Sequence, residues 1–132
     1  MIKKQKTSRT LNVMLWIAQS ILAILLLSGA AMKFMPVEKI SVMMPWTGQV
    51  PVFLLRLLAM IDLLGALGLL LPGLLHIKPV LVIWACAGIS ILMLSAIVFH
   101  ICRGEANVIG FNIICLLMAV FITIGRIKRQ EI

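Results

Sequence analysis

Seven of the polar residues within or beside the long apolar segments collect on one side of the membrane in the topology that the sequence predicts. They are Lys33, Arg56, Asp62, His100, Arg103, Glu105 and Asn112. Polar side chains are costly in a bilayer, and they usually face the interior of a helix bundle or a water-filled cavity. This polar cluster could bind the polar head group of an amphipathic ligand or relay protons. The alternative is an ion-pair and hydrogen-bond cluster that only holds the helices in register.

Asp62 is the deepest residue of the polar cluster. It lies about ten residues, or about 15 Å, into its apolar segment, which places it near the bilayer midplane. A carboxylate at that depth must be neutral or paired, because an isolated buried ion is too costly. Arg56 precedes it by six positions and points about 120° away, so the two are not a local pair. We expect a partner on another helix, and the candidates are Lys33, His100 and Asn112.

The sequence offers little for covalent or metal chemistry. The serines in the apolar segments can bond to carbonyls of their own helices, so none is a candidate nucleophile. His76 and His100 lie at opposite ends of the third predicted helix, 24 residues or about 36 Å apart, which excludes a shared haem iron. No other cluster has the spacing of metal ligands. We therefore expect no catalytic residue and no metal site, and His100 is either an interfacial hydrogen-bonding residue or a group that titrates near neutral pH beside Arg103 and Glu105.

The three cysteines lie in apolar surroundings and have no C-x-x-C spacing. We expect all three to serve as small packing residues: Cys86, Cys102 and Cys115. Cys86 and Cys102 are about 24 Å apart on one predicted helix and cannot bridge each other. A disulfide between Cys102 and Cys115, across neighbouring helices, stays open.

The composition defines the elements that must position these residues. The chain has 132 residues, of which 63% are hydrophobic and 12% are charged, against roughly 45–50% and about 25% in soluble domains. Four spanning helices need about 80 residues, which leaves only short tails and loops. A separate nucleotide-binding or hydrolase module is therefore excluded, because one βαβ unit alone takes about 30 residues. We expect a single membrane domain over residues 1–132.

Four apolar segments predict four membrane helices, at about residues 11–32, 52–71, 80–102 and 108–124. Apolar residues occur all round each segment, as in membrane helices and unlike strands of alternating period. Pro72-Gly73 is expected to end the second helix, and Gly125-Arg126 the fourth. The expected fold is an all-α membrane protein, with four transmembrane helices in an antiparallel bundle.

Residues 33–51 connect the first two predicted helices. Pro36, Pro45 and Pro51 break any long helix there, while Phe34 and Trp46 keep the segment apolar. We expect an interfacial or re-entrant segment, because irregular backbone is tolerated only at the membrane surface or buried in protein.

Small residues in the predicted helices allow backbones to approach each other closely. Four glycines are expected to serve helix packing: Gly29, Gly65, Gly68 and Gly88.

The formal net charge is +8, and its distribution predicts an orientation. With the N terminus inside, eight basic residues lie on the inner side: Lys3, Lys4, Lys6, Arg9, Lys78, Arg126, Lys128 and Arg129. The positive-inside rule then places the basic tails, residues 1–10 and 126–132, in the cytoplasm. The basic residues suit anionic membrane lipids rather than nucleic acid, because no stacking aromatics accompany them. A cleaved signal peptide ending near Ser28-Gly29-Ala30 is the alternative for the first segment.

Three stretches together resemble the DoxX-like family of small integral membrane proteins. The stretches are S-G-A-A-M-K-F (28–34), L-R-L-L-A-M-I-D-L-L-G-A-L-G-L-L-L-P (55–72) and A-I-V-F-H-I-C-R-G-E (96–105). The family residues that map onto this chain are Gly29, Lys33, Arg56, Asp62, His100 and Arg103. The family usually has Glu where this chain has Asp62, which keeps the charge and shortens the reach by one methylene.

The resemblance implies a multi-pass bundle in the bacterial cytoplasmic (inner) membrane with a loose link to redox systems. Some relatives are the membrane subunit of thiosulfate:quinone oxidoreductase, and others are linked to oxidative-stress complexes. The first hypothesis is therefore a non-autonomous membrane subunit that binds a quinone or similar amphipathic molecule in its outer half, beside a partner protein. The second is a scaffold or assembly factor that docks another membrane protein or forms a homo-oligomer. A small transporter is the third.

Overall fold

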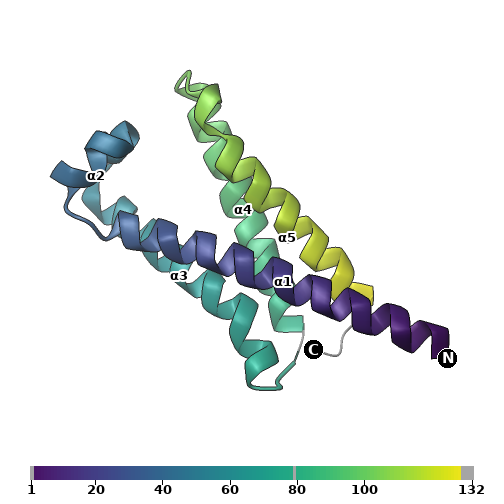
Figure 1. Ribbon diagram of the computed structural model, residues 1–132. Helices are drawn as coiled ribbons and strands as arrows, with labels where there is room; N and C mark the ends of the chain where they lie inside the picture. Colours follow the sequence, from purple (N-terminus) through teal and green to yellow (C-terminus); the bar gives the residue numbers. More distant parts are fainter. Residues whose placement is uncertain (1, 79, 129–132) are drawn as a thin grey trace.

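The computed structural model describes residues 2–78 and 80–128 (Figure 1). The described residues form five α-helices and two 3₁₀ helices, with no strand among them. In chain order these are α1 (Ile2–Lys33), α2 (Val37–Met43), η1 (Pro45–Gly48), α3 (Val52–Leu74), α4 (Val80–Cys102), η2 (Ala106–Val108) and α5 (Gly110–Lys128).

Four of these helices are long and apolar enough to cross a membrane: Arg9–Lys33, Val52–Leu74, Val80–Cys102 and Gly110–Lys128. Their outward side chains are large and apolar, as shown by Phe53 and Trp84, which are 78% and 69% exposed. Contact of such side chains with lipid tails is favourable, whereas their exposure to water is costly. The predicted all-α, four-helix membrane bundle is confirmed.

Three helix ends differ from the expected ones. The first helix begins at Ile2 rather than near residue 11, because Lys, Gln and Arg are good helix formers beyond the apolar span. Pro72 does not end α3, which continues to Leu74. A proline so close to a helix end removes one hydrogen bond only, and Leu75 N still donates to Leu71 O at 2.8 Å. The fourth spanning helix continues past Gly125-Arg126 to Lys128. Pro79 and residues 129–132 of the basic tail lie outside the described residues.

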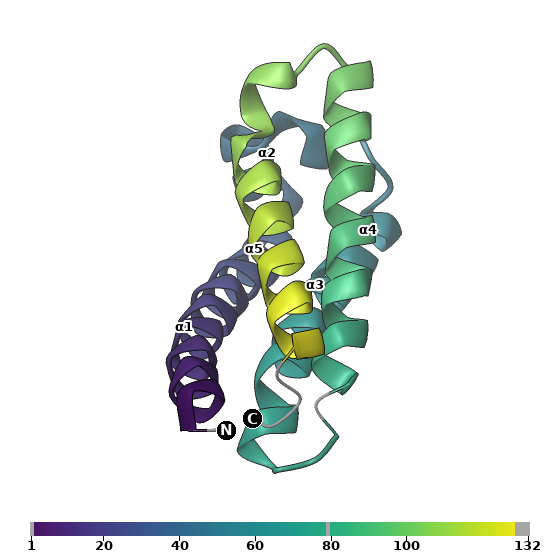
Figure 2. The ribbon, with the colours of Figure 1, turned by 90° about the vertical axis from the view of Figure 1, so that its right-hand side faces the viewer.

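The helices pack as two antiparallel pairs. The most extensive contacts join α1 to α3 and α4 to α5, while α3 also packs on α4 and α1 on α5. Figure 1 shows that the two pairs lie close together at one end of the bundle and diverge at the other. Figure 2 shows the same bundle from its right-hand side. The diverging end contains Lys33, the first turn of α3 and the α4–α5 loop; we call it the pocket end. The opposite end, with Leu74, Val80 and Lys128, is the tail end.

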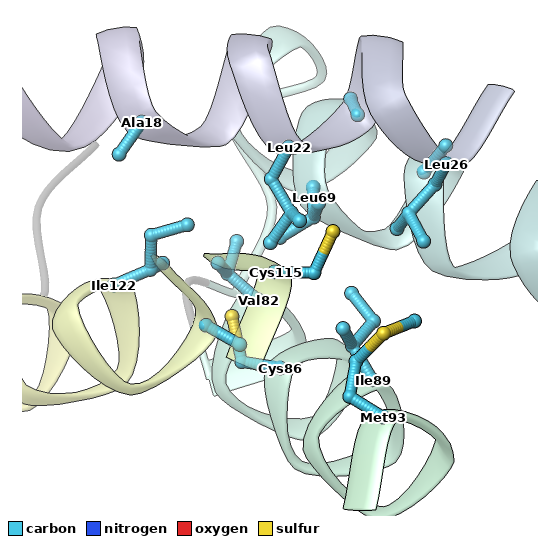
Figure 3. Close-up of a cluster of buried hydrophobic side chains, with 13 residues drawn as sticks. Ala18, Leu22, Leu26, Leu69, Val82, Cys86, Ile89, Met93, Cys115 and Ile122 are labelled. Carbon is cyan, nitrogen blue, oxygen red and sulfur yellow. The ribbon is translucent and has the colours of Figure 1, made fainter. Parts of the chain in front are cut away.

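A buried apolar core holds the two pairs together (Figure 3). Leu22 and Leu26 of α1 and Leu69 of α3 meet Ile89 of α4 and Ile122 of α5. The core also contains Cys86 and Cys115. These buried side chains pack closely against one another, as in the interiors of other proteins, and so join the two helical pairs.

All three cysteines are free, so no disulfide joins Cys102 to Cys115. Cys86 and Cys115 are buried in the core, while Cys102 is exposed at the end of α4. The packing role is therefore seen for the two buried cysteines.

Two of the four glycines expected at helix contacts face α4. A Cβ at Gly65 would lie 3.2 Å from Ile89 Cγ1, and one at Gly68 would lie 2.8 Å from Ala85 Cβ. Gly29 instead faces an ion pair described below. The expectation for Gly88 is wrong, because a Cβ there would meet nothing within 4 Å. Gly88 is exposed, and it lies on a face of α4 that no other described helix covers.

The connecting segment, residues 34–51, forms two short helices, α2 and η1, at the pocket end. Pro36 precedes α2 and Pro45 begins η1, so the prolines fall where a missing N–H costs least. Ile40 and Thr47 are fully buried. The two short helices pack mainly on each other, and η1 also contacts α3.

Candidate functional site

An ion pair links α1 to α3 at the pocket end. Lys33 Nζ donates to Asp62 Oδ2 at 2.5 Å. The Asp62 side chain is 2% exposed and that of Lys33 is 17% exposed. Of the three partners expected for Asp62, the structure selects Lys33. Gly29 leaves room for the pair, since a Cβ there would lie 3.2 Å from Asp62 Oδ2 and 3.5 Å from Lys33 Nζ.

Arg56 closes the end of α1. Its Nη1 donates to the carbonyl oxygens of Lys33 at 2.5 Å and Met35 at 2.8 Å. The last carbonyls of a helix have no partner within the helix, and a cation near that end also complements the helix dipole. Arg56 therefore holds the start of the connecting segment against α3, and it pairs with backbone rather than with Asp62.

The end of α4 carries a second group of polar contacts. His100 Nδ1 lies 3.1 Å from Glu105 Oε1, and Arg103 Nε donates to the same oxygen at 2.9 Å. Arg103 Nη2 also donates to Gln49 Oε1 in the connecting segment. The hydrogen bonds from Arg103 and, second, from His100 hold the pKa of Glu105 below its ordinary value of 4.5. These contacts tie the α4–α5 loop to the end of η1.

Aromatic contacts continue this connection. The ring centroid of Trp46, from η1, lies 5.9 Å from those of Phe99 and His100 on α4, both in edge-to-face geometry. Phe99 and His100 are 5.3 Å apart, and the Arg103 guanidinium lies 5.3 Å from the Phe99 ring centroid. Such aromatic and cation–π pairs stabilise a fold by more than the burial of their apolar surface alone. Trp46, which keeps the connecting segment apolar, packs its ring against α4.

Two adjoining cavities lie among these residues. The first, which we call the deep cavity, has a volume of about 300 Å³. Its walls are Leu25, Leu26, Gly29, Lys33, Trp46, Val50, Leu54, Leu58, Asp62, Leu92, Met93, Ser95, Ala96, Phe99, His100, Phe111 and Asn112. The second, which we call the end cavity, has a volume of about 280 Å³. Its walls are Leu25, Ser28, Gly29, Met32, Lys33, Met43, Met44, Pro45, Trp46, His100, Glu105, Val108, Phe111 and Asn112.

Five members of the polar cluster line a cavity and two do not. Lys33, His100 and Asn112 line both cavities, Asp62 lines the deep one and Glu105 the end one. Arg56 and Arg103 line neither, and their contacts hold the adjoining segments in place. Asn112 is 8% exposed, so its amide is buried on the wall that α5 contributes. The cavities thus combine a few polar groups with apolar walls, as small-molecule sites do.

The sequence-based interpretation missed a polar network at the tail end. Arg126, assigned to the basic tail, is fully buried: its Nε donates to Gln19 Oε1 at 2.7 Å, and its Nη1 donates to Asn12 Oδ1 at 2.8 Å. Gln19 Nε2 in turn donates to Leu69 O at 2.6 Å. Arg126 Cζ also lies 6.0 Å from the ring centroid of Trp16. Gln19, an amide inside an apolar run, was the available signal for this network.

These features define a multi-pass membrane protein with a polar pocket between two helical pairs. A sequence model of the DoxX-like family matches residues 17–122, and the chain belongs to this family. The matched range contains all seven residues of the polar cluster and ends before Arg126. No curated protein and no solved structure matches the chain.

Proposed function

We propose that this protein is a non-autonomous membrane subunit that binds a quinone or similar amphipathic molecule in the deep cavity, while a partner protein carries out electron transfer. One observation carries the proposal: the cavity places the Lys33–Asp62 ion pair, His100 and Asn112 on walls that are mostly apolar. Its volume of about 300 Å³ is at the lower end of the range for small-molecule sites.

The polar groups suit a ligand that accepts hydrogen bonds. An ammonium group has three N–H donors, and Asp62 accepts from one of those of Lys33, so the same group can serve a ligand carbonyl. The Asn112 amide supplies further donors. Trp46, Phe99 and Phe111 offer aromatic faces and edges to a planar ring. A quinone, with two carbonyl oxygens on a flat ring, meets these requirements.

The proposal can be tested by equilibrium binding of a labelled benzoquinone to the full-length protein in lipid nanodiscs. Asn112→Leu removes a donor from the wall and keeps the ion pair, so we expect affinity to fall about tenfold, as for the loss of about 1.4 kcal/mol. Asn107→Leu is the matched control, because Asn107 is exposed and lines neither cavity. Native mass spectrometry of gently extracted protein should also detect a co-purified quinone. Absence of binding to the wild type, or equal affinity in both variants, would reject the proposal.

The orientation and location that we propose follow from the charge pattern. Basic residues are concentrated at the two termini and at Lys78, which favours a cytoplasmic tail end and a pocket end in the outer half of the bacterial inner membrane. A fluorescent reporter that folds only in the cytoplasm, fused to the C terminus, should therefore be bright. A periplasmic phosphatase reporter should be active there only if the orientation is reversed.

A scaffold role is the second candidate, favoured by the way polar contacts tie elements together. Lys33–Asp62 joins α1 to α3, and Arg103–Gln49 joins the α4–α5 loop to the connecting segment. In this role the protein would dock another membrane protein or a second copy of itself and would bind no small molecule. Native mass spectrometry separates the two candidates, since a discrete oligomer or protein complex with only bulk phospholipid supports the scaffold.

A further inference from the structure

The two cavities meet at the polar cluster and extend from it to different depths. Lys33, Trp46, His100 and Asn112 line both of them. The residues that line only one cavity come from different parts of the bundle. Their positions therefore indicate where each cavity leads.

The deep cavity leads toward the middle of the membrane between α3 and α4. Leu58 lies on α3, and Leu92 and Ala96 lie on α4. Leu92 precedes Cys102 by ten residues, or about 15 Å of helix, which is half of a hydrocarbon core of about 30 Å. Ser95 is the one hydroxyl on this wall, and it donates to Ile91 O at 2.8 Å. The wall is therefore suited to an alkyl chain.

The deep cavity also reaches residues that are accessible on the bundle surface, from the first turn of α3 at the pocket end to Ser95 on α4. Leu54 on α3 is 39% exposed, and Ser95 on α4 is also exposed. Both residues line the cavity, belong to spanning helices and remain accessible in the folded bundle. A molecule in the deep cavity would thus contact the lipid tails directly, between α3 and α4.

The end cavity leads to the surface of the pocket end. Residues found only there include Met32 at the end of α1, Met43 and Met44 beside η1, and Glu105 in the α4–α5 loop. All of them lie at a helix end or in a connection, where a membrane protein meets the head-group region. Glu105 adds a carboxylate to this wall, and its hydrogen-bonded partners His100 and Arg103 lie beside it, so this side suits a polar head group.

We propose that the ligand of this site is a single-tailed amphiphile that enters sideways from the membrane. Its head group lies between Lys33 and His100, and its tail passes along the deep cavity and leaves between α3 and α4. The inference rests on the proposed function and adds the class of ligand and the direction in which it lies. A small tail-less polar molecule would leave the apolar half of the cavity empty.

The experiment compares two benzoquinones with the same ring substituents, one with a decyl tail and one with a methyl group in its place. Ala96→Phe places a ring in the deep cavity, and Ser28→Phe places one at the end cavity. Binding to each variant is expressed relative to the wild type for the same compound, so partition into lipid cancels. Leu54→Phe is a second blocking variant, at the exposed edge of the deep cavity, in case Ala96→Phe does not fold.

We expect Ala96→Phe to weaken binding of the decyl compound at least about tenfold, and to leave binding of the methyl compound within about twofold of the wild type. Ser28→Phe should not weaken binding of the decyl compound more than binding of the methyl compound. The inference is overturned if both compounds respond equally to Ala96→Phe, or if Ser28→Phe is the variant that discriminates against the tail. If the wild type binds neither compound, the proposed function itself fails, which is a distinct result.

Discussion

Lys33 Nζ lies 2.5 Å from Asp62 Oδ2, so the last residue of α1 is bound to the interior of α3 across 29 positions of sequence. Gly29, one turn before Lys33, supplies the space for the carboxylate. The contact fixes how far α1 extends along α3 and brings a cation to the wall of the deep cavity. It therefore serves both the packing of the bundle and the chemistry proposed for the site.

Removing one member of this pair should destabilise the bundle more than removing both. Asp62→Leu leaves the Lys33 ammonium without its carboxylate, and we expect a loss of about 3 kcal/mol, at the low end for a buried pair because Lys33 is partly exposed. The double variant Lys33→Met/Asp62→Leu should recover most of that loss, since no buried charge remains. Thermal or denaturant unfolding in one fixed detergent measures both. A double variant less stable than Asp62→Leu would contradict this account.

Glycine positions should divide into tight and open ones. Gly125→Ala would place a Cβ against the Leu15 side chain, closer than a van der Waals contact, and we expect overpacking to cost about 1–3 kcal/mol. Gly88→Ala is the control in a neighbouring helix, because nothing lies within 4 Å of its Cβ position. It should be neutral or stabilising by up to about 1 kcal/mol through helix propensity. Equal midpoints of unfolding for the two variants would show that Gly125 is not a close contact.

Arg126 should stabilise the tail end through geometry as well as charge. Arg126→Lys keeps the charge but cannot reach Gln19 and Asn12 with two separate nitrogens, so we expect a loss of about 2 kcal/mol. Lys128→Met, on the exposed side of the same helix, is the control and should change stability by less than about 0.5 kcal/mol. Denaturant unfolding of the three proteins measures the difference. A lysine variant as stable as the wild type would show that charge alone is sufficient.

Glu105 should make the stability of the α4–α5 loop depend on pH. Its pKa is lowered in the folded protein by hydrogen bonds from Arg103 and His100. Because the folded-state pKa is lowered, the contribution of Glu105 to stability is fully present above the ordinary pKa of 4.5. That contribution is lost as the pH falls through the folded-state pKa. Relative to the intrinsic rate at each pH, hydrogen exchange of the 103–109 loop should be faster below the folded-state pKa of Glu105 than above it in the wild type. Glu105→Gln should show the fast relative rate on both sides of that pKa, and a wild-type loop whose relative rate does not change with pH would contradict the role.

The fold was largely predictable because its physical cause is local. Four apolar runs of spanning length predicted α1, α3, α4 and α5, since backbone polar groups in lipid must bond within their own helix. The helix ends were less predictable: Pro72 and Gly125 are helix breakers by type, yet both lie inside helices. At Gly125 the reason is a contact with Leu15, about 110 residues earlier, that no local pattern contains.

The polar cluster was predictable as a set but not as a set of partners. The cost of burying charge determined, from the sequence alone, that Asp62 needs a partner on another helix. Three candidates were equally compatible with chain order, and only the angle at which α1 crosses α3 brings Lys33 to it. The same packing directs Arg56 to the end of α1 and buries Arg126 beside Gln19. The sequence thus determined which elements span the membrane and that Asp62 must be paired, whereas tertiary structure decided the pairs and the cavities, because those depend on helix crossing and rotation.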